Sequence, residues 1–229
     1  MKLYDRVIEG EFISRPNRFI AICRIEGREE TCHVKNTGRC KELLVPGCRV
    51  ILNRCDGERR KTKYDLVAVY KGKMLVNIDS QAPNKVFREF ADCGKFIGYA
   101  RIYPEKKFGN SRFDFYMEKE ARRIICEIKG VTLEENGVCS FPDAPTTRGQ
   151  RHVSELTDLV GQGYDCHIVF IVQMHGMKYL VPNRDNDPIF AERLITARQA
   201  GVKITALECA VSEDSMTVCG EIPVKIDMQ

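Results

Sequence analysis

Two neighbouring segments of the sequence carry residues that could perform metal-dependent chemistry. Arg112–Tyr116 and Arg122–Gly130 have the composition of β-strands, and the short gap between them predicts a hairpin. Because side chains alternate across a strand, Glu127 and Lys129 share one face, and the hairpin can bring Asp114 beside them. Two carboxylates and an ammonium are costly to bury without compensation, which a divalent metal usually supplies. The pattern predicts a metal-dependent phosphodiesterase site.

The alternative for these three residues is a solvated hairpin face with Glu–Lys ion pairs, because acidic and basic residues at this spacing are common. Two features favour the metal site. Glu127 and Lys129 directly follow the apolar Ile124–Cys126, and Asp114 lies between two phenylalanines. Charges inside apolar strands need a partner or a function.

The first eighty residues contain several short strand-like segments separated by turn signals. Asn36–Gly38 followed by Arg39–Leu44 predicts a turn and one short helix. This pattern fits a small closed barrel of about five strands of the oligonucleotide-binding type, although another small barrel remains an alternative. The predicted strands are Val7–Ile13, Phe19–Ile25, Glu30–Val34, Arg49–Asn53, Tyr64–Tyr70 and Lys73–Asn77.

From Gln81 onwards the apolar spacing becomes that of an α/β unit. The continuous apolar run Ile168–Val172 is typical of a strand covered on both faces. We therefore expect an α+β chain of two domains, an OB-fold-like β-barrel over residues 1–80 and a mixed-sheet α/β sandwich over residues 81–229. The predicted helices are Gln81–Cys93, Thr147–Gly161 and Pro188–Ala200, and the later strands are His167–Gln173 and Val202–Cys209.

The charge is unevenly distributed, although the net charge is only +4. Residues 1–80 hold 17 Lys and Arg against 11 Asp and Glu, whereas the remainder holds 19 against 21. The basic first third predicts a phosphate-binding module, with a solvated basic surface as the alternative. No run of eighteen apolar residues is present, so we expect no membrane span, and the charged opening residues favour a cytoplasmic location over export.

The eleven cysteines are scattered and form no C-x-x-C pair, which favours reduced thiols over disulfides or a structural zinc site. His33 and His175 are interpreted as structural. The sequence has no glycine-rich phosphate loop and no nicotinamide fingerprint, so it gives no support to a sugar-metabolising enzyme.

Longer motifs carry a family resemblance that covers nearly the whole chain. They are Asn36–Gly38, Pro46–Gly47, Glu105–Phe115, Glu127–Leu133, Phe141–His152, Asp187–Ala191 and Ala200–Val202. Together they resemble the sugar fermentation stimulation protein A family, and the Phe141–His152 block is the most specific. The resemblance implies an N-terminal OB-fold that binds DNA and a restriction-endonuclease-like domain of the PD-(D/E)XK nuclease type. It also implies a link to the regulation of sugar-utilisation genes.

Carried onto this sequence, the resemblance implies that Asp114 and Glu127 are metal ligands, with the Ile128 carbonyl as a third. Lys129 would orient or deprotonate the attacking water and stabilise the developing phosphorane charge. Oxygen ligands favour Mg²⁺ or Mn²⁺ over Zn²⁺. Glu105 is expected as a further ligand, with Glu89 as its alternative.

The predicted nucleic-acid contacts fall in both domains. Arg148 and Gln150 are predicted to bind a phosphate, and the alternative is that they brace Lys129. His152 is predicted to contact nucleic acid, and the alternative is that it is a half-buried helix residue. Phe19, Tyr64 and Tyr70 are available for base stacking, with core packing as the alternative. The predicted contacts are Lys35, Asn36, Arg39, Lys41, Arg112, Arg148, Gln150 and His152. The cluster Arg59, Arg60, Lys61 and Lys63 is a further candidate for phosphate contact, with a solvated turn as the favoured alternative.

Two functions follow from these expectations. The first is a DNA-binding, metal-dependent nuclease, and the second is a non-catalytic DNA-binding regulator built on a nuclease fold. The presence of Asp114, Glu127 and Lys129 together favours the enzyme. The choice between single- and double-stranded DNA, and between a monomer and a homodimer, stays open.

Overall fold

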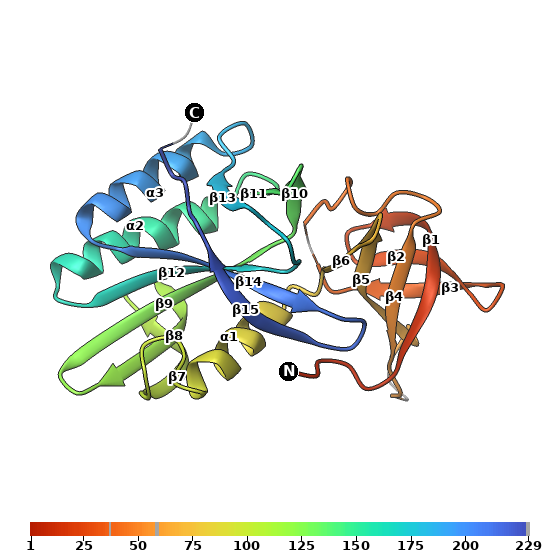
Figure 1. Cartoon of the computed structure of the whole chain (residues 1–229), viewed down its shortest axis with the longest axis horizontal. Coiled ribbons are helices and arrows are strands. Elements are labelled where there is room, and N and C mark those ends of the chain that lie inside the picture. The colour runs from red at the N-terminus through yellow and green to blue at the C-terminus, as the bar shows by residue number, and fades with distance from the viewer. Residues whose placement is uncertain (37, 58–59, 228–229) are drawn as a thin grey trace.

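The computed structural model describes residues 1–36, 38–57 and 60–227. A β-barrel lies beside a larger sheet that is flanked by helices (Figure 1). Within the described residues no helix is long and apolar enough to cross a membrane. All eleven cysteines are free thiols.

The N-terminal part forms the predicted five-stranded barrel, which is thereby confirmed. The strands pair in the order β3-β2-β1-β4-β5-β6, and a parallel pairing of β3 with β5 closes the first five into a barrel. Alternate side chains of these strands, such as Val50 and Leu52, point into the apolar interior. The bounds are β1 Val7–Asn17, β2 Ile20–Ile25, β3 Arg28–Val34, β4 Arg49–Arg54, β5 Tyr64–Lys71 and β6 Met74–Asn77.

The short helix predicted over Arg39–Leu44 is wrong. This segment is a turn in which the Cys40 carbonyl accepts hydrogen bonds from the amides of Leu43 and Leu44. Cys40 has a φ of 45°, a left-handed conformation that an α-helix does not admit.

The second part is a mixed six-stranded sheet in the order β15-β14-β12-β9-β8-β7. Its central strand β12 runs parallel to both neighbours, β9 and β14, and its residues from Cys166 to Val172 are buried, as the apolar run predicted. The bounds are β7 Arg101–Phe108, β8 Ser111–Lys119, β9 Arg122–Val131, β12 Asp165–Val172, β14 Lys203–Val211 and β15 Met216–Ile222.

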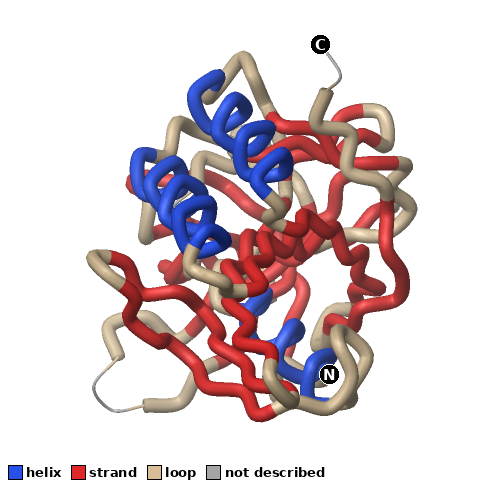
Figure 2. The backbone as a smooth tube through the Cα atoms, turned by 90° about the vertical axis from the view of Figure 1, so that its left-hand side faces the viewer, coloured by secondary structure: helices blue, strands red, loops and turns tan. Residues whose placement is uncertain are grey.

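Helices cover both faces of this sheet. Helices α2 (Thr147–Gly161) and α3 (Pro188–Ala200) pack side by side on one face, whereas α1 (Ala82–Asp92) packs on the other (Figure 2). The observed bounds of α2 and α3 agree with the bounds that the sequence predicted. A small third sheet, which the sequence did not reveal, contains β10 (Leu133–Glu135), β11 (Val138–Phe141) and β13 (Tyr179–Pro182).

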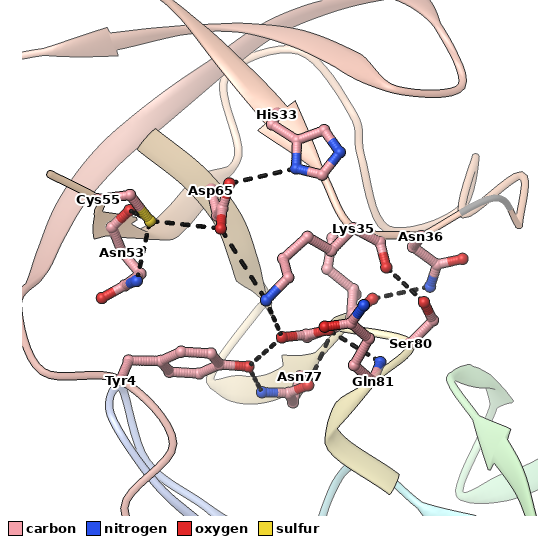
Figure 3. A network of polar contacts seen from close by, with 12 residues as sticks. Tyr4, His33, Lys35, Asn36, Asn53, Cys55, Asp65, Asn77, Ser80 and Gln81 are labelled. Carbon is pink, nitrogen blue, oxygen red and sulfur yellow. Dashed lines mark hydrogen bonds and ion pairs between the residues drawn. The ribbon is translucent and has the colours of Figure 1, made fainter. Parts of the chain in front are cut away.

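Buried polar contacts join the barrel to the second sheet, near the labelled Tyr4 and Asn77 (Figure 3). The Asn77 side-chain amide donates to the Tyr4 hydroxyl at 2.8 Å, and its carbonyl oxygen accepts from the Gln173 amide at 3.0 Å. The backbone amide of Asn77 also donates to the Gln173 carbonyl at 3.0 Å. Since Gln173 directly follows β12, these bonds fix β6, which pairs with the barrel strand β5, against the end of the central strand.

Candidate metal and catalytic site

The β8–β9 hairpin brings Asp114, Glu127 and Lys129 together. The two strands pair antiparallel up to Phe115 opposite Cys126, and Asp114 and Glu127 are the next residues of β8 and β9 beyond that pair. Lys129 follows two residues later on the same face of β9. One strand pair therefore supplies two carboxylates and one ammonium to one end of the sheet.

Asp114 is held by two hydrogen bonds. Its Oδ2 accepts from the backbone amide of Ile128 at 2.8 Å, and its Oδ1 accepts from the side-chain amide of Asn84 at 2.8 Å. Burial and the negative charge of Glu127 raise the pKa of Asp114 above its ordinary value. Asn84, near the start of α1, was missed by the sequence analysis because no local pattern links that helix to the hairpin.

Glu127 is buried and has two cationic or polar partners on the same oxygen. Its Oε1 lies 2.6 Å from Lys129 Nζ and 2.5 Å from His152 Nδ1. Burial raises the pKa of Glu127, but the Lys129 charge and the His152 contact outweigh it, so the pKa lies below its ordinary value. Glu127 is therefore an ionised carboxylate at neutral pH.

The second oxygen of Glu127 provides a test of whether a metal fits here. Oε2 is buried and has no hydrogen-bond partner among the described residues. An unpaired oxygen of a buried carboxylate is costly unless a cation satisfies it. With Asp114 adjacent, the donors are hard oxygens, which fit Mg²⁺ or Mn²⁺.

The other predicted ligands have contacts of their own in the structure. Glu105 is on β7, and its exposed side chain forms an ion pair with Arg112 at 3.5 Å. Glu89 on α1 pairs with the terminal amine of Met1 at 3.1 Å. The Ile128 backbone contacts Asp114 through its amide nitrogen, and the role of its carbonyl as a ligand stays a prediction.

Helix α2 delivers His152 to the site. The helix begins after Thr146, whose hydroxyl accepts from the Gly149 amide at 3.0 Å. His152, predicted as a DNA contact, is buried against Glu127, whereas Arg148 is exposed. Gln150, also predicted as a DNA contact, donates instead to Asp187 Oδ1 at 2.8 Å.

In the barrel, Lys35 and Asn36 belong to a network of polar contacts (Figure 3). Lys35 Nζ lies 3.1 Å from Asp79 Oδ2, and the Asn36 amide donates to the Ile78 carbonyl at 2.8 Å. Both side chains thus join the segment after β3 to the segment after β6, where the sequence predicted phosphate contacts. Arg60 forms an ion pair with Asp65, whereas the sequence favoured a solvated turn for its cluster. Thr37 and Arg59 lie outside the described residues.

Arg39 and Lys41 lie in a basic groove. Both side chains are exposed, and they line a cavity of about 490 Å³ together with Arg15 and Arg18. Arg15, missed by the sequence analysis, donates to the carbonyls of Asn36, Gly38 and Arg39 and so holds this loop. Its position near the end of β1, directly before Pro16, gave no indication of these contacts.

The three aromatic residues proposed for stacking differ in exposure. Phe19 is 51% exposed. Tyr64 is half-buried and packs against the core, and the guanidinium of Arg49 lies 4.2 Å from the ring centroid of Tyr70. Phe19 is therefore the most accessible of the three for a base.

Family models match both parts of the chain. The model described as "SfsA N-terminal OB domain" matches residues 13–78, and "Sugar fermentation stimulation protein RE domain" matches residues 81–215. The chain belongs to the SfsA family. A sugar fermentation stimulation protein homolog of Desulfitobacterium hafniense (strain DSM 10664 / DCB-2) is 54% identical over 223 residues, which cover 97% of this chain and 98% of the relative. The homolog of Clostridium beijerinckii is 47% identical over 216 residues, covering 94% and 96%.

The fold also matches a solved SfsA structure. The Pyrococcus furiosus SfsA protein in complex with Ca²⁺ superposes with a TM-score of 0.91 at 32% identity, covering 98% of this chain and 99% of that one. The family predicted from the motifs and the two-part architecture are thereby confirmed.

Proposed function

We propose that this SfsA-family protein is a metal-dependent phosphodiesterase of the PD-(D/E)XK type that cleaves DNA. The observation that carries the proposal is the cluster of Asp114, Glu127 and Lys129, in which Glu127 is buried and its Oε2 has no partner among the described residues. Buried polar atoms normally have a hydrogen-bond partner, and a bound cation would satisfy this oxygen.

In this proposal each residue has a separate role. Asp114 and Glu127 hold Mg²⁺ or Mn²⁺, with the Ile128 carbonyl as a further ligand. The bound cation supplies a water of lowered pKa and charge stabilisation at the phosphate. Lys129, held 2.6 Å from Glu127, orients that water and stabilises the negative charge that develops on the phosphorane.

His152 acts as a positioning residue. Its contact with Glu127 Oε1 fixes the rotation of the carboxylate, so the free Oε2 points away from Lys129 and His152. Hydrogen bonds that orient a ligand in this way commonly affect metal affinity about 10–100-fold.

The Ca²⁺ complex of the Pyrococcus furiosus relative supports a hard-cation site in this family. Ca²⁺ and Mg²⁺ share a strong preference for oxygen donors. The oxygen donors of Asp114 and Glu127 have this chemistry.

DNA as the substrate is supported by the OB domain and by the basic groove of Arg15, Arg18, Arg39 and Lys41. The groove is connected to the second domain, because the amide of Arg39 donates to Asp143 Oδ2 at 3.1 Å. Asp143 lies in the segment that leads from β11 into α2, the helix that carries His152. A strand in the groove would thus lie next to the segment of the second domain that leads into α2.

The decisive experiment incubates the full chain with linear, circular and single-stranded DNA, with Mg²⁺ or Mn²⁺ and with chelator. We expect metal-dependent cleavage that chelator stops and that Lys129→Ala abolishes. Salt-sensitive DNA binding without cleavage of any substrate would overturn the nuclease. It would favour the alternative, a non-catalytic DNA-binding regulator of sugar utilisation.

A further inference from the structure

Three metal-binding side chains meet at the opposite end of the sheet from the β8–β9 hairpin turn. They are His175, Glu208 and Cys219. His175 Nδ1 lies 3.1 Å from Glu208 Oε2 and 3.6 Å from Cys219 Sγ, and Cys219 Sγ lies 3.9 Å from Glu208 Oε2. The three donor atoms therefore form a compact triangle.

The triangle has the dimensions of a tetrahedral metal site. Bonds of about 2.0 Å to nitrogen, 2.1 Å to oxygen and 2.3 Å to sulfur give ligand separations of about 3.3–3.6 Å at tetrahedral angles. The observed separations of 3.1, 3.6 and 3.9 Å bracket these values. A cation at the centre would need only a few tenths of an ångström of movement by each side chain.

Irregular backbone features place two of the three ligands. Cys219 is the extra residue of a β-bulge, because its neighbours Val218 and Gly220 pair with consecutive residues of β14. Bulges redirect side chains and are frequent beside functional sites. His175 lies in the turn after β12, next to Gly176, whose φ of 90° suits glycine.

Glu208 is held in the orientation that a ligand needs. It is only 8% exposed, so its charge calls for compensation. Its Oε1 accepts from the backbone amide of Met177 at 2.6 Å, which directs Oε2 at His175 and Cys219. A backbone donor on the non-ligating oxygen is a common device for orienting carboxylate ligands.

The site is accessible from solvent. The His175 side chain is 67% exposed and lines a groove of about 600 Å³ between the barrel and the β14–β15 hairpin, with Tyr70 and Glu213 among its other walls. Three protein ligands beside an open groove leave a fourth position for water or another small ligand.

The cluster is separate from the Asp114–Glu127 site. Glu208 pairs with Val172 of β12, whereas Glu127 pairs with Ile168, four residues earlier. The two carboxylates are thus roughly 13 Å apart along the strands, in addition to two strand spacings across the sheet.

We propose that His175, Glu208 and Cys219 form a second metal site, which binds a divalent transition metal of the Zn²⁺ class. An imidazole, a thiolate and a carboxylate are a borderline-soft set of ligands, which selects Zn²⁺ or Co²⁺ over Mg²⁺. The sequence analysis interpreted His175 as structural and found no zinc spacing, because these ligands are far apart in the chain and meet only through the β12–β14–β15 pairing.

The test uses Zn²⁺ and Co²⁺ on the full chain, reduced, with excess Mg²⁺ to occupy the carboxylate site. We expect calorimetry to show that one equivalent of Zn²⁺ binds. Bound Co²⁺ should give a thiolate-to-cobalt charge-transfer absorption, which should disappear when Zn²⁺ displaces the Co²⁺. Cys219→Ser should abolish the absorption and weaken Zn²⁺ binding at least about 100-fold, which exceeds the usual effect of an outer-shell change. Cys93→Ser, which removes another exposed thiol, should change neither.

His175→Ala is the second variant, because its exposed side chain can be removed without opening the core. It should weaken Zn²⁺ binding by a similar factor while the melting temperature without metal stays unchanged. Zn²⁺ should also protect Cys219, but not Cys93, from alkylation measured by mass spectrometry. Equal Zn²⁺ affinity in the wild type and both variants, or Co²⁺ binding without thiolate absorption, would overturn the second site.

Discussion

His152 Nδ1 on helix α2 lies 2.5 Å from Glu127 Oε1 on strand β9. This contact joins the helix layer to the candidate metal site, because the same oxygen also accepts from Lys129 at 2.6 Å. Two donors on one oxygen leave the other free, and the position of α2 therefore decides which way the carboxylate faces.

The first prediction concerns this contact. His152→Leu should weaken Mn²⁺ binding about 10–100-fold, because Glu127 loses the donor that orients it. His152→Asn should restore part of the affinity, since its side-chain amide nitrogen can occupy a position near that of Nδ1. Calorimetric titration of both variants with Mn²⁺ measures the difference, and equal losses in the two variants would show that only ring packing matters.

The second prediction concerns the cluster itself. Asp114→Ala, Glu127→Ala and Lys129→Ala should each reduce metal-dependent DNA cleavage about 100-fold or more, because each removes a ligand or the charge that stabilises the transition state. The Asp114→Ala, Glu127→Ala double variant should lose about as much cleavage activity as either single variant, since the effects of cooperating residues are non-additive. Circular dichroism of each variant controls for folding. Wild-type cleavage by the double variant would indicate a contaminating nuclease.

The third prediction concerns metal and stability. A cation that binds only the folded chain stabilises it by about 2.7 kcal/mol at one hundred times its dissociation constant. For a chain of this size that corresponds to a rise in melting temperature of about 5–10 °C with Mg²⁺ or Mn²⁺. Glu127→Ala should show no such rise in thermal scans. Equal rises in both proteins would place the stabilising ion elsewhere.

The sequence predicted the strands and helices better than the contacts between them. Alternation and apolar runs identified the barrel, the β8–β9 hairpin and the bounds of α2 and α3, since these depend on local periodicity. Local periodicity also indicated that Glu127 and Lys129 share a face. The turn at Cys40 was missed because a left-handed φ leaves no mark on local apolar periodicity.

The partners from other elements could not be predicted in the same way. Asn84, His152 and Asp187 reach their partners across 30, 25 and 37 residues of sequence, and only the packing of the helices on the sheet sets those distances. The phosphate contact predicted for Lys35 came only from the basic composition of its segment. Its actual partner, Asp79, is 44 residues away and becomes visible only in the folded chain.

The fourth prediction concerns Asp187, which starts helix α3 and ties it to α2. Its carboxylate accepts from the amides of Phe190 and Thr146, each at 2.9 Å, and from Gln150 at 2.8 Å. Asp187→Ala should cost about 2 kcal/mol, or about 4–8 °C in melting temperature, because it removes a helix cap and two further hydrogen bonds.

The loss of stability caused by Asp187→Ala should depend on pH. Burial raises the pKa of Asp187, but the three hydrogen bonds outweigh it and hold the pKa below the ordinary value of 3.8. A carboxyl group with a lowered pKa in the folded state stabilises the fold above its ordinary pKa, and this stabilisation is lost as pH falls through the folded-state value. Thermal scans between pH 7 and pH 3 should show the gap between wild type and Asp187→Ala narrowing toward the acid end. A gap that stays constant would show that the charge of Asp187 contributes nothing.

The last prediction concerns the basic groove. Arg39 and Lys41 are exposed and line it together, so a bound strand would place phosphates against both side chains. Each phosphate contact contributes about −0.7 to −0.9 to the slope of log affinity against log salt, because the contact releases condensed counterions. The Arg39→Ala, Lys41→Ala double variant of the full chain should therefore flatten this slope by about one to two units.

The matched control removes an equal charge from another surface. Arg198 on α3 and Lys203 on β14 are exposed and lie outside the groove, and their double alanine variant should leave the slope within about half a unit of the wild type. Fluorescence anisotropy with a labelled oligonucleotide at several salt concentrations gives both slopes. Equal flattening by the two variants would show that net charge alone attracts DNA. An unchanged slope for the Arg39→Ala, Lys41→Ala variant would indicate that DNA contacts another surface. Arg148 is then the next candidate, because it is exposed on the first turn of α2, the helix that also carries His152.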